Sequence, residues 1–483
     1  MAETTKESTV SSQNPKAKGS EPEITSDQAV KALIPLLITF ILGTLCLQGF
    51  NLVFTQVGQD VGAPAQASLI TALPSIVLGI VCFVYGSLGD FVSLKKLVIV
   101  GITLLITGSI FGFVANFFFK ANIWTVIIAR VIQTAGEQVA GSVYLVVATK
   151  YLKDSLKVIF FGIFTAGYQV SAAIGVFAAG FLTSIHWQYL FLIPVVTILF
   201  LPLLLHNLPN KSGTGEKVDV WGFVLFGTAT AFLTLFFSYT MWWMLLISVA
   251  LYVVFAVYIH KAKNPFITPD FFHNTRWIMA ISLVLLFYLP NYSFSPIFNA
   301  IGSEIYHLRT DTISLYIVWA FVVAAIFGTC SGWIIGKIGK TRGIFLAGGA
   351  QLVGLVVASF CVNVSPVALA LAGCVYYAGI GMMYSPIIDS VLGTLTKDES
   401  GRGVGMNDLA MNVAGSIGIA IIGGLMSSKP MTGFSLAGLK GSAANYGNLF
   451  LVAAIATVAG LVVFIVCHKK IYAGTNEELP SAE

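Results

Sequence analysis

The chain has 483 residues, of which 57% are hydrophobic and only 10% are charged, with a formal net charge of +5. A soluble protein this apolar would have too little polar surface to stay dissolved, which excludes that class. Apolar runs of about 20 residues recur along the chain, and each is long enough to cross a hydrocarbon layer roughly 30 Å thick. The composition therefore predicts an all-α integral membrane protein.

The apolar runs predict fourteen membrane spans. In chain order they lie at residues 33–56, 67–88, 97–117, 123–148, 158–184, 187–207, 221–240, 242–260, 277–301, 313–336, 344–362, 366–394, 404–427 and 448–468.

The positive charges divide unequally between the two sides of this topology. If the N-terminus lies in the cytoplasm, 21 of the 26 Lys and Arg residues fall in cytoplasmic tails and loops, and Arg130 lies within a span. The external loops hold Lys120, Arg309, Lys429 and Lys440. This asymmetry predicts a multi-pass protein of the cell (cytoplasmic) membrane with both termini cytoplasmic. Because the excess charge belongs to these loops, no nucleic-acid partner is expected.

The remaining sequence outside the spans offers little for catalysis. Residues 1–28 and 470–483 are polar and predict cytoplasmic tails, the first of them disordered. The six cysteines lie in or beside apolar spans without metal-ligand or disulfide spacing, so no metal site is expected. Walker, zinc-binding and nucleophile-elbow patterns are also missing. Enzyme chemistry is therefore not expected, which favours a transporter or channel.

Two loops of the chain look alike. One reads Gly86-Ser-Leu-Gly-Asp90-Phe-Val-Ser-Leu-Lys95, between spans two and three. The other reads Gly332-Trp-Ile-Ile-Gly336-Lys337, between spans ten and eleven. Both place small residues at a helix end before a short basic turn. A matched pair eight spans apart indicates internal duplication, as in transporters built from two similar bundles.

These loops carry a resemblance to the major facilitator superfamily, in particular to its fourteen-helix drug/proton and bacterial tetracycline/proton antiporters. Gly86, Leu88, Asp90 and Lys95 match the family signature of the first loop. Span four, Ile127-Ile-Ala-Arg130-Val-Ile-Gln133-Thr-Ala-Gly136-Glu137, resembles a second signature of the family. In span five, however, Val176 stands where the antiporters carry a proline.

The resemblance implies a major facilitator fold with two six-helix bundles, at residues 29–208 and 275–469, and two inserted helices within 219–262. A small-molecule substrate would bind between the bundles, midway through the lipid bilayer. The family relationship further implies a monomer that uses no cofactor and draws its energy from a proton gradient.

Span four contains two ionisable residues at mid-membrane depth. Arg130 and Glu137 are seven residues apart, so they share one helix face, with Gln133 and Thr134 between them. Charges in a bilayer are costly and usually serve a function, so this stripe is expected to face the central cavity. Glu137 is interpreted as a proton carrier or as an anchor for a cationic substrate. The alternative is a structural partner of Arg130.

The second bundle contains two further acids. Asp389 in span twelve is the expected counterpart in proton coupling, and a role in helix packing is the alternative. Asp408 lies early in span thirteen, where it is interpreted as an interfacial cap near a cytoplasmic gate. The other gating residues expected are Gly86, Asp90 and Lys95.

The substrate site is predicted from amides and aromatic hydroxyls within the spans. Span nine is interrupted by two prolines, a pattern tolerated where backbone lines a cavity. The expected substrate-binding residues are Gln48, Asn51, Gln133, Tyr168, Gln169, Asn291, Tyr292 and Asn412.

The sequence thus predicts a proton-coupled secondary transporter that exports small amphipathic organic compounds, as multidrug transporters do. One alternative is a proton symporter, or an exporter of one specific metabolite or lipid. Another is a membrane receptor or regulator that retains the fold without transport.

Overall fold

The computed structural model describes residues 25–88, 92–152, 154–208, 218–395 and 400–473. All regular elements of these residues are helical, and twelve helices are long and apolar enough to cross a membrane. The all-helical prediction is confirmed. The predicted count of fourteen spans is not confirmed, because predicted spans four and nine are each divided into two shorter helices.

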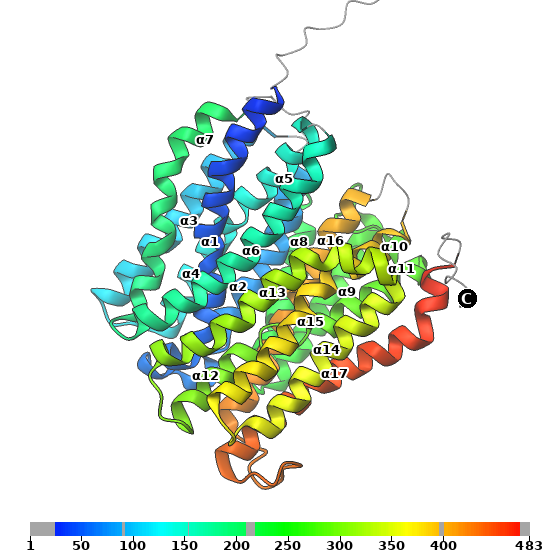
Figure 1. Cartoon of the computed structure of the whole chain (residues 1–483). Coiled ribbons are helices and arrows are strands. Elements are labelled where there is room, and N and C mark those ends of the chain that lie inside the picture. Colours follow the sequence, from blue (N-terminus) through cyan, green and yellow to red (C-terminus); the bar gives the residue numbers. More distant parts are fainter. Residues whose placement is uncertain (1–24, 89–91, 153, 209–217, 396–399, 474–483) are drawn as a thin grey trace, which may run out of the picture.

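The first half of the chain forms one helical group, at the upper left of Figure 1. The first helix begins at Ser26, where Thr25 caps it, so it extends into the predicted tail. The elements are α1 (Ser26–Asp60), η1 (Pro64–Gln66), α2 (Leu69–Leu88), α3 (Leu94–Phe117), α4 (Ile123–Glu137), α5 (Val139–Tyr151), α6 (Asp154–Thr183), η2 (Trp187–Phe200) and α7 (Leu201–Asn207).

The second half forms a similar group at the lower right of Figure 1, after an inserted helix pair, α8 and α9. The elements are α8 (Val220–Tyr239), α9 (Trp242–Lys261), α10 (Pro269–His273), α11 (Thr275–Tyr288), α12 (Phe294–Glu304), α13 (Thr310–Ile338), α14 (Lys340–Cys361), α15 (Pro366–Leu392), α16 (Ser400–Ser428) and α17 (Gly441–Ile471).

The two divided spans are broken in different ways. Gln138 alone separates α4 from α5 and keeps right-handed dihedral angles (φ −82°, ψ −11°). The break between α11 and α12 contains Pro290, which has no N–H to continue a helix. Its carbonyl accepts a hydrogen bond from the Tyr376 hydroxyl at 2.8 Å. A side chain from α15 thus satisfies one backbone group that the break leaves free.

Helix packing within the first half recurs in the second half. At the α3–α4 contact, Gly136 lies against the carbonyl of Gly101. At the α14–α15 contact, Gly379 lies in the same way against the carbonyl of Ala347. Small residues let helix backbones approach closely in a membrane, where apolar burial alone does not drive association. The same close approach therefore builds both halves.

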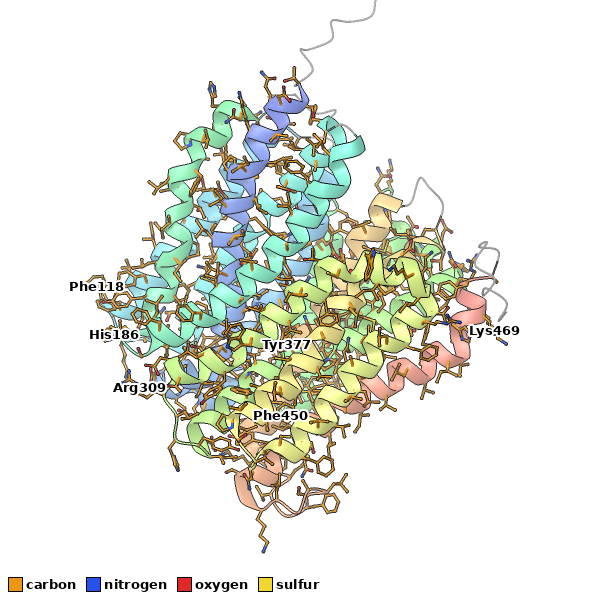
Figure 2. The ribbon with its side chains drawn as sticks, viewed as in Figure 1. Phe118, His186, Arg309, Tyr377, Phe450 and Lys469 are labelled. Atoms are coloured by element: carbon orange, nitrogen blue, oxygen red, sulfur yellow. The ribbon has the colours of Figure 1, made fainter. Side chains whose placement is uncertain are left out.

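The halves meet along two antiparallel contacts, α2 with α16 and α6 with α13. The ends of these helices define two faces of the molecule. The face at which α1, α6 and α16 begin is called the near face. The opposite face, at which these helices end, is called the far face. Figure 2 shows Tyr377 among the helices, with Arg309 and Lys469 at the periphery.

The inserted pair packs through α8 against α2 and α16. The Asp219 carboxylate caps α8 by accepting from the Gly222 N–H, and it also accepts from the Phe266 N–H, each at 2.9 Å. The Phe266 ring then stacks on Phe223, with centroids 4.2 Å apart. The polar clamp and the stacked rings therefore join the two ends of the insert, and Phe83 of α2 packs against both rings.

The close α3–α4 contact predicts that Gly136→Ala destabilises the protein. An added Cβ would lie 2.1 Å from the Gly101 carbonyl oxygen, whereas one at Gly349 of α14 would meet nothing within 4 Å. Overpacking costs about 1–3 kcal/mol. Thermal unfolding of the purified protein in detergent should show a lower midpoint for Gly136→Ala and an unchanged or higher one for Gly349→Ala. Equal midpoints would contradict this packing.

Candidate functional site

A cavity of about 360 Å³ lies between the two halves, near the middle of their helices. We call it the central cavity. Its walls come from α1, α2, α5 and α6 of the first half and from α11, α13, α15 and α16 of the second. Six of the residues singled out from the sequence line it: Gln48, Tyr168, Gln169, Asn291, Asp408 and Asn412.

The other residues that line the central cavity were not predicted from the sequence. They include the aromatic residues Phe164, Tyr288, Tyr377 and Tyr384, and Gln138 adds an amide from the α4–α5 break. An aromatic residue in a membrane span gives no sequence signal that separates a cavity wall from helix packing. The position of Gln138 beside Glu137 was the one available clue.

Asp408 is the acid of the cavity wall among the described lining residues. It lies about two turns inside α16, so its interpretation as an interfacial cap is wrong. Its Oδ1 accepts a hydrogen bond from the Tyr384 hydroxyl at 3.1 Å. Its backbone carbonyl accepts from the Asn412 amide at 2.9 Å. The cavity therefore presents a carboxylate that is bonded to a phenol, next to an amide that is bonded to the backbone of the same residue.

Asn51 and Tyr292 lie behind the wall of the central cavity rather than on it. Both are buried, and the Asn51 amide donates to the Tyr292 carbonyl at 3.2 Å. The Tyr292 hydroxyl in turn donates to Asn412 Oδ1 at 3.1 Å. These residues position Asn412 and satisfy the broken backbone, so their expected direct contact with substrate is not supported by this geometry.

Four side-chain hydrogen bonds of the described residues join the two halves between the cavity and the far face. Two are reciprocal: Asn51 of α1 donates to the Tyr292 carbonyl, and Asn299 of α12 donates to the Leu52 carbonyl at 2.9 Å. The other two run from Thr310 to Gln56 and from Ser416 to the carbonyl of Ala72. The halves are therefore fastened together on the far side of the cavity.

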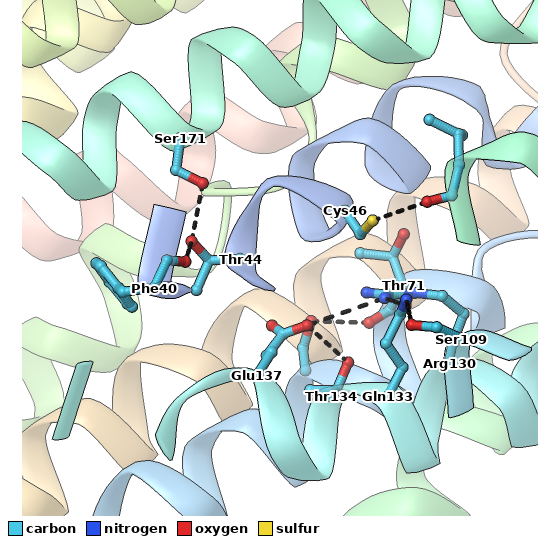
Figure 3. A network of polar contacts seen from close by, with 12 residues as sticks. Phe40, Thr44, Cys46, Thr71, Ser109, Arg130, Gln133, Thr134, Glu137 and Ser171 are labelled. Atoms are coloured by element: carbon cyan, nitrogen blue, oxygen red, sulfur yellow. Dashed lines mark hydrogen bonds and ion pairs between the residues drawn. The ribbon is translucent and has the colours of Figure 1, made fainter. Parts of the chain in front are cut away.

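The predicted acid–base pair forms, but away from the cavity. Arg130 Nη1 and Glu137 Oε2 are 3.9 Å apart, and both side chains have no exposed area. Arg130 also donates to Gln133, whose amide donates to the Ser109 hydroxyl of α3 at 2.8 Å. Figure 3 shows this network within the first half. The expectation that the pair and Gln133 face the central cavity is wrong for this structure.

The pair is incompletely satisfied. Among the described residues, Arg130 Nε and Nη2 and Glu137 Oε1 have no hydrogen-bond partner. The guanidinium lies over the Phe50 ring, 4.9 Å from its centroid, and the Thr134 hydroxyl donates to Glu137 at 3.3 Å. Burying charges costs free energy that such sparse bonding only partly offsets. The ionised pair is therefore sensitive to any change that admits water.

The α4–α5 break connects this network to the cavity. Glu137 is the last residue of α4 and lies in the buried pair, whereas the next residue, Gln138, lines the central cavity. A rearrangement of the peptide between Glu137 and Gln138 would therefore affect both the buried ion pair and the cavity wall. The acid–base pair and the cavity wall are thus neighbours along the backbone, although the carboxylate itself does not line the cavity.

Asp389 lies apart from both the pair and the cavity. Its side chain is 54% exposed at the near-face end of α15, where its carboxylate is 2.6 Å from Lys340 Nζ at the start of α14. Asp389 was predicted to be the counterpart of Glu137 in proton coupling, and the structure places it at a helix end rather than in the cavity wall. The observed position agrees with the alternative role in helix packing.

Two of the expected gating residues, Gly86 and Lys95, lie at the near-face end of α2 and at the start of α3. Gly86 is exposed there, and Lys95 is half-buried in the first turn of α3. Asp90 lies outside the described residues. Gly86 and Lys95 do not line the central cavity.

Comparison with known proteins explains this architecture. The family model described as Major Facilitator Superfamily matches residues 36–419. The chain belongs to this family. Membership places it among transporters rather than enzymes.

Two curated relatives of this major facilitator are transporters by name. The uncharacterized MFS-type transporter EfpA of Mycobacterium tuberculosis is 24% identical over 417 residues, which cover 79% of this chain and 76% of EfpA. The multidrug transporter protein MdtP of Bacillus subtilis is 22% identical over 392 residues, which cover 77% of this chain and 70% of MdtP.

Solved structures share the fold at lower identity. A mutant of the nucleoside transporter NupG superposes with a TM-score of 0.60 at 12% identity, covering 91% of this chain and 99% of NupG. The peptide transporter POT in complex with sulfate superposes with a TM-score of 0.63 at 15% identity, covering 91% of this chain and 95% of POT. At these identities the likeness concerns the fold alone.

The buried pair of this major facilitator predicts a clear double-mutant cycle. Arg130→Met or Glu137→Leu alone leaves one charge buried without its partner, which costs about 3–5 kcal/mol. The double variant removes both charges and should recover much of that loss. Unfolding in mixed detergent micelles measures each variant, and additive losses would show that the two side chains do not interact.

Proposed function

We propose that this major facilitator is a proton-coupled exporter of small amphipathic organic compounds that works by alternating access. The observation that carries the proposal is the central cavity between the two halves. Its wall combines aromatic rings with amides and a single described carboxylate, Asp408. Such a lining suits compounds that have an apolar body and a few polar groups.

The arrangement of contacts around the cavity supports alternating access. The four inter-half hydrogen bonds lie on its far side, so a rocking motion that breaks them would open the cavity there. Matched packing in the two halves allows each to move as a unit about the α2–α16 and α6–α13 contacts. With the near face in the cytoplasm, as the charge distribution predicts, this motion releases substrate outside.

Export of varied compounds is favoured by the printed name of one relative, the multidrug transporter MdtP. The cavity agrees with that class, because several of its polar groups are flexible amides on different helices, such as Gln48, Gln138 and Gln169. Flexible side chains that adjust to different ligands favour breadth over selectivity.

Proton coupling is assigned to Glu137. In the present conformation Arg130 favours its ionised form, while burial opposes ionisation. Movement at the α4–α5 break would change both influences at once, so that Glu137 binds a proton in one conformation and releases it in another. Asp408 would sense the substrate directly, because it lines the cavity.

The proposal predicts that Glu137→Gln abolishes transport driven by a pH gradient in proteoliposomes while substrate counterflow survives. Glutamine has nearly the same size as glutamate but cannot bind and release a proton. Substrate counterflow should survive because it does not require that step. Transport of a panel of amphipathic compounds is measured with the gradient imposed and with it collapsed. Proton-driven transport that survives in Glu137→Gln would refute the assignment.

The Asp389→Asn variant tests whether Asp389 shares in proton coupling, as the sequence predicts, or whether Glu137 acts without it. Asp389 is half-exposed and paired with Lys340, and exposed ion pairs contribute at most about 1 kcal/mol. Gradient-driven transport should therefore remain near the wild-type rate. Loss of coupling with retained counterflow would restore Asp389 as a coupling acid.

A further inference from the structure

A second, larger pocket of about 760 Å³ lies at the far face. We call it the far pocket. It is lined by the ends of α1, α8 and α16 together with α12 and Tyr446 of α17. Four aromatic side chains contribute to its wall: Phe54, Phe236, Phe237 and Tyr446. Two of the four inter-half hydrogen bonds described above, those of Asn299 and Gln56, involve residues of its wall.

We infer that the far pocket is a second ligand site for amphipathic organic ammonium compounds, and that Lys429 occupies the place of the ligand's ammonium group. The inference rests on the proposed function, since an exporter needs a place to receive what leaves the central cavity. It names the substrate class as compounds that join a protonated amine to an apolar body.

The far pocket already holds a tethered cation. Lys429 Nζ is 2.6 Å from Glu304 Oε2 and 5.7 Å from the centre of the Tyr446 ring. A carboxylate beside an aromatic face is a favourable environment for an ammonium group. The pocket thus contains the recognition elements for such a group, occupied by the protein's own lysine.

This occupant can be displaced. The side chains of Lys429 and Glu304 are 34% and 36% exposed, and ion pairs that water reaches are weak. A ligand with an ammonium head would replace the lysine at Glu304, while its apolar part gains contact with the aromatic wall. Lys429 would then act as a competitor that lets bound cations leave.

Unused hydrogen-bond acceptors inside the pocket point to the same chemistry. Asn299 belongs to the pocket wall and is only 2% exposed, and its Oδ1 has no hydrogen-bond partner in the described part of the chain. Within the same residues, the buried Ser238 hydroxyl of α8 also has no partner, and Ser238 is part of the wall. Asn299 also donates to the Leu52 carbonyl across the halves, so a ligand here would contact a residue of the far-side closure.

This site also gives the inserted helices a role. The end of α8 supplies Phe236, Phe237, Ser238 and Thr240, which form one side of the pocket. Gly424 of α16 lies close to the Phe237 carbonyl, where an added Cβ would be 2.7 Å from the oxygen. The insert is therefore part of a ligand-binding wall as well as a scaffold.

The test measures binding of N-dansyl-1,5-diaminopentane, a fluorescent compound with one protonated amine, to the purified full chain in lipid nanodiscs. Lys429→Gln removes the competing cation and should tighten binding about fivefold. Glu304→Gln should weaken it. Lys440→Gln is the matched control, because Lys440 is exposed on the same connecting segment and does not line the pocket. The N-acetylated, neutral probe should bind equally to wild type and Lys429→Gln.

Equal affinities for Lys429→Gln and Lys440→Gln would overturn the inference, as would the same tightening with the neutral probe. The comparison of these two lysine variants decides the matter even if Glu304→Gln fails to fold. Measuring gradient-driven transport with the same two lysine variants, which keep Glu137, separates the two proposals. Tightening in Lys429→Gln without gradient-driven transport by any of these proteins, wild type included, supports the far pocket and refutes proton-coupled export. Transport without tightening refutes the far pocket alone.

Discussion

Hydrocarbon offers no hydrogen-bond partners, so every polar group within the membrane must be satisfied inside the protein. This constraint explains the main features of the molecule. The break between α11 and α12 survives because Tyr376 and Asn51 donate to its free carbonyls. Arg130 and Glu137 are tolerated because they lie against each other in the interior of the first half. A further group of polar side chains lies at the contact between the halves, where they line the central cavity or fasten its far side.

The two halves share their packing but not their chemistry. Gly136 and Gly379 make the same close helix contact, one residue before Glu137 in α4 and one residue before Ile380 in α15. The first half thus places a buried acid where the second half has an apolar side chain of the cavity wall. In the proposed mechanism, the relative motion of the two similarly packed halves would act on this one buried acid.

The fold was largely predictable because membrane spans have a strong apolar signal, and the helix break after Tyr288 follows from Pro290. The site was only partly predictable. The seven-residue spacing predicted the pairing of Arg130 with Glu137, but their helix face packs against other helices of the same half, and periodicity does not distinguish such a buried face from a cavity wall. The depth of Asp389 in the membrane could not be predicted, because it depends on the residue at which α15 ends. The sequence near the end of this span does not identify that residue. Tyr384 and Tyr377 carried no signal that distinguishes them from packing residues.

The central claim is that Glu137, dry in the present structure, meets water at another stage of the transport cycle. Infrared difference spectroscopy of the protein in nanodiscs tests this claim directly, because a protonated carboxyl has its own C=O band that shifts in deuterated water. The account predicts a band, absent from Glu137→Gln, that appears on addition of a transported compound and exchanges rapidly with deuterium. A Glu137 that shows no change in protonation, or a band that never exchanges, would contradict it.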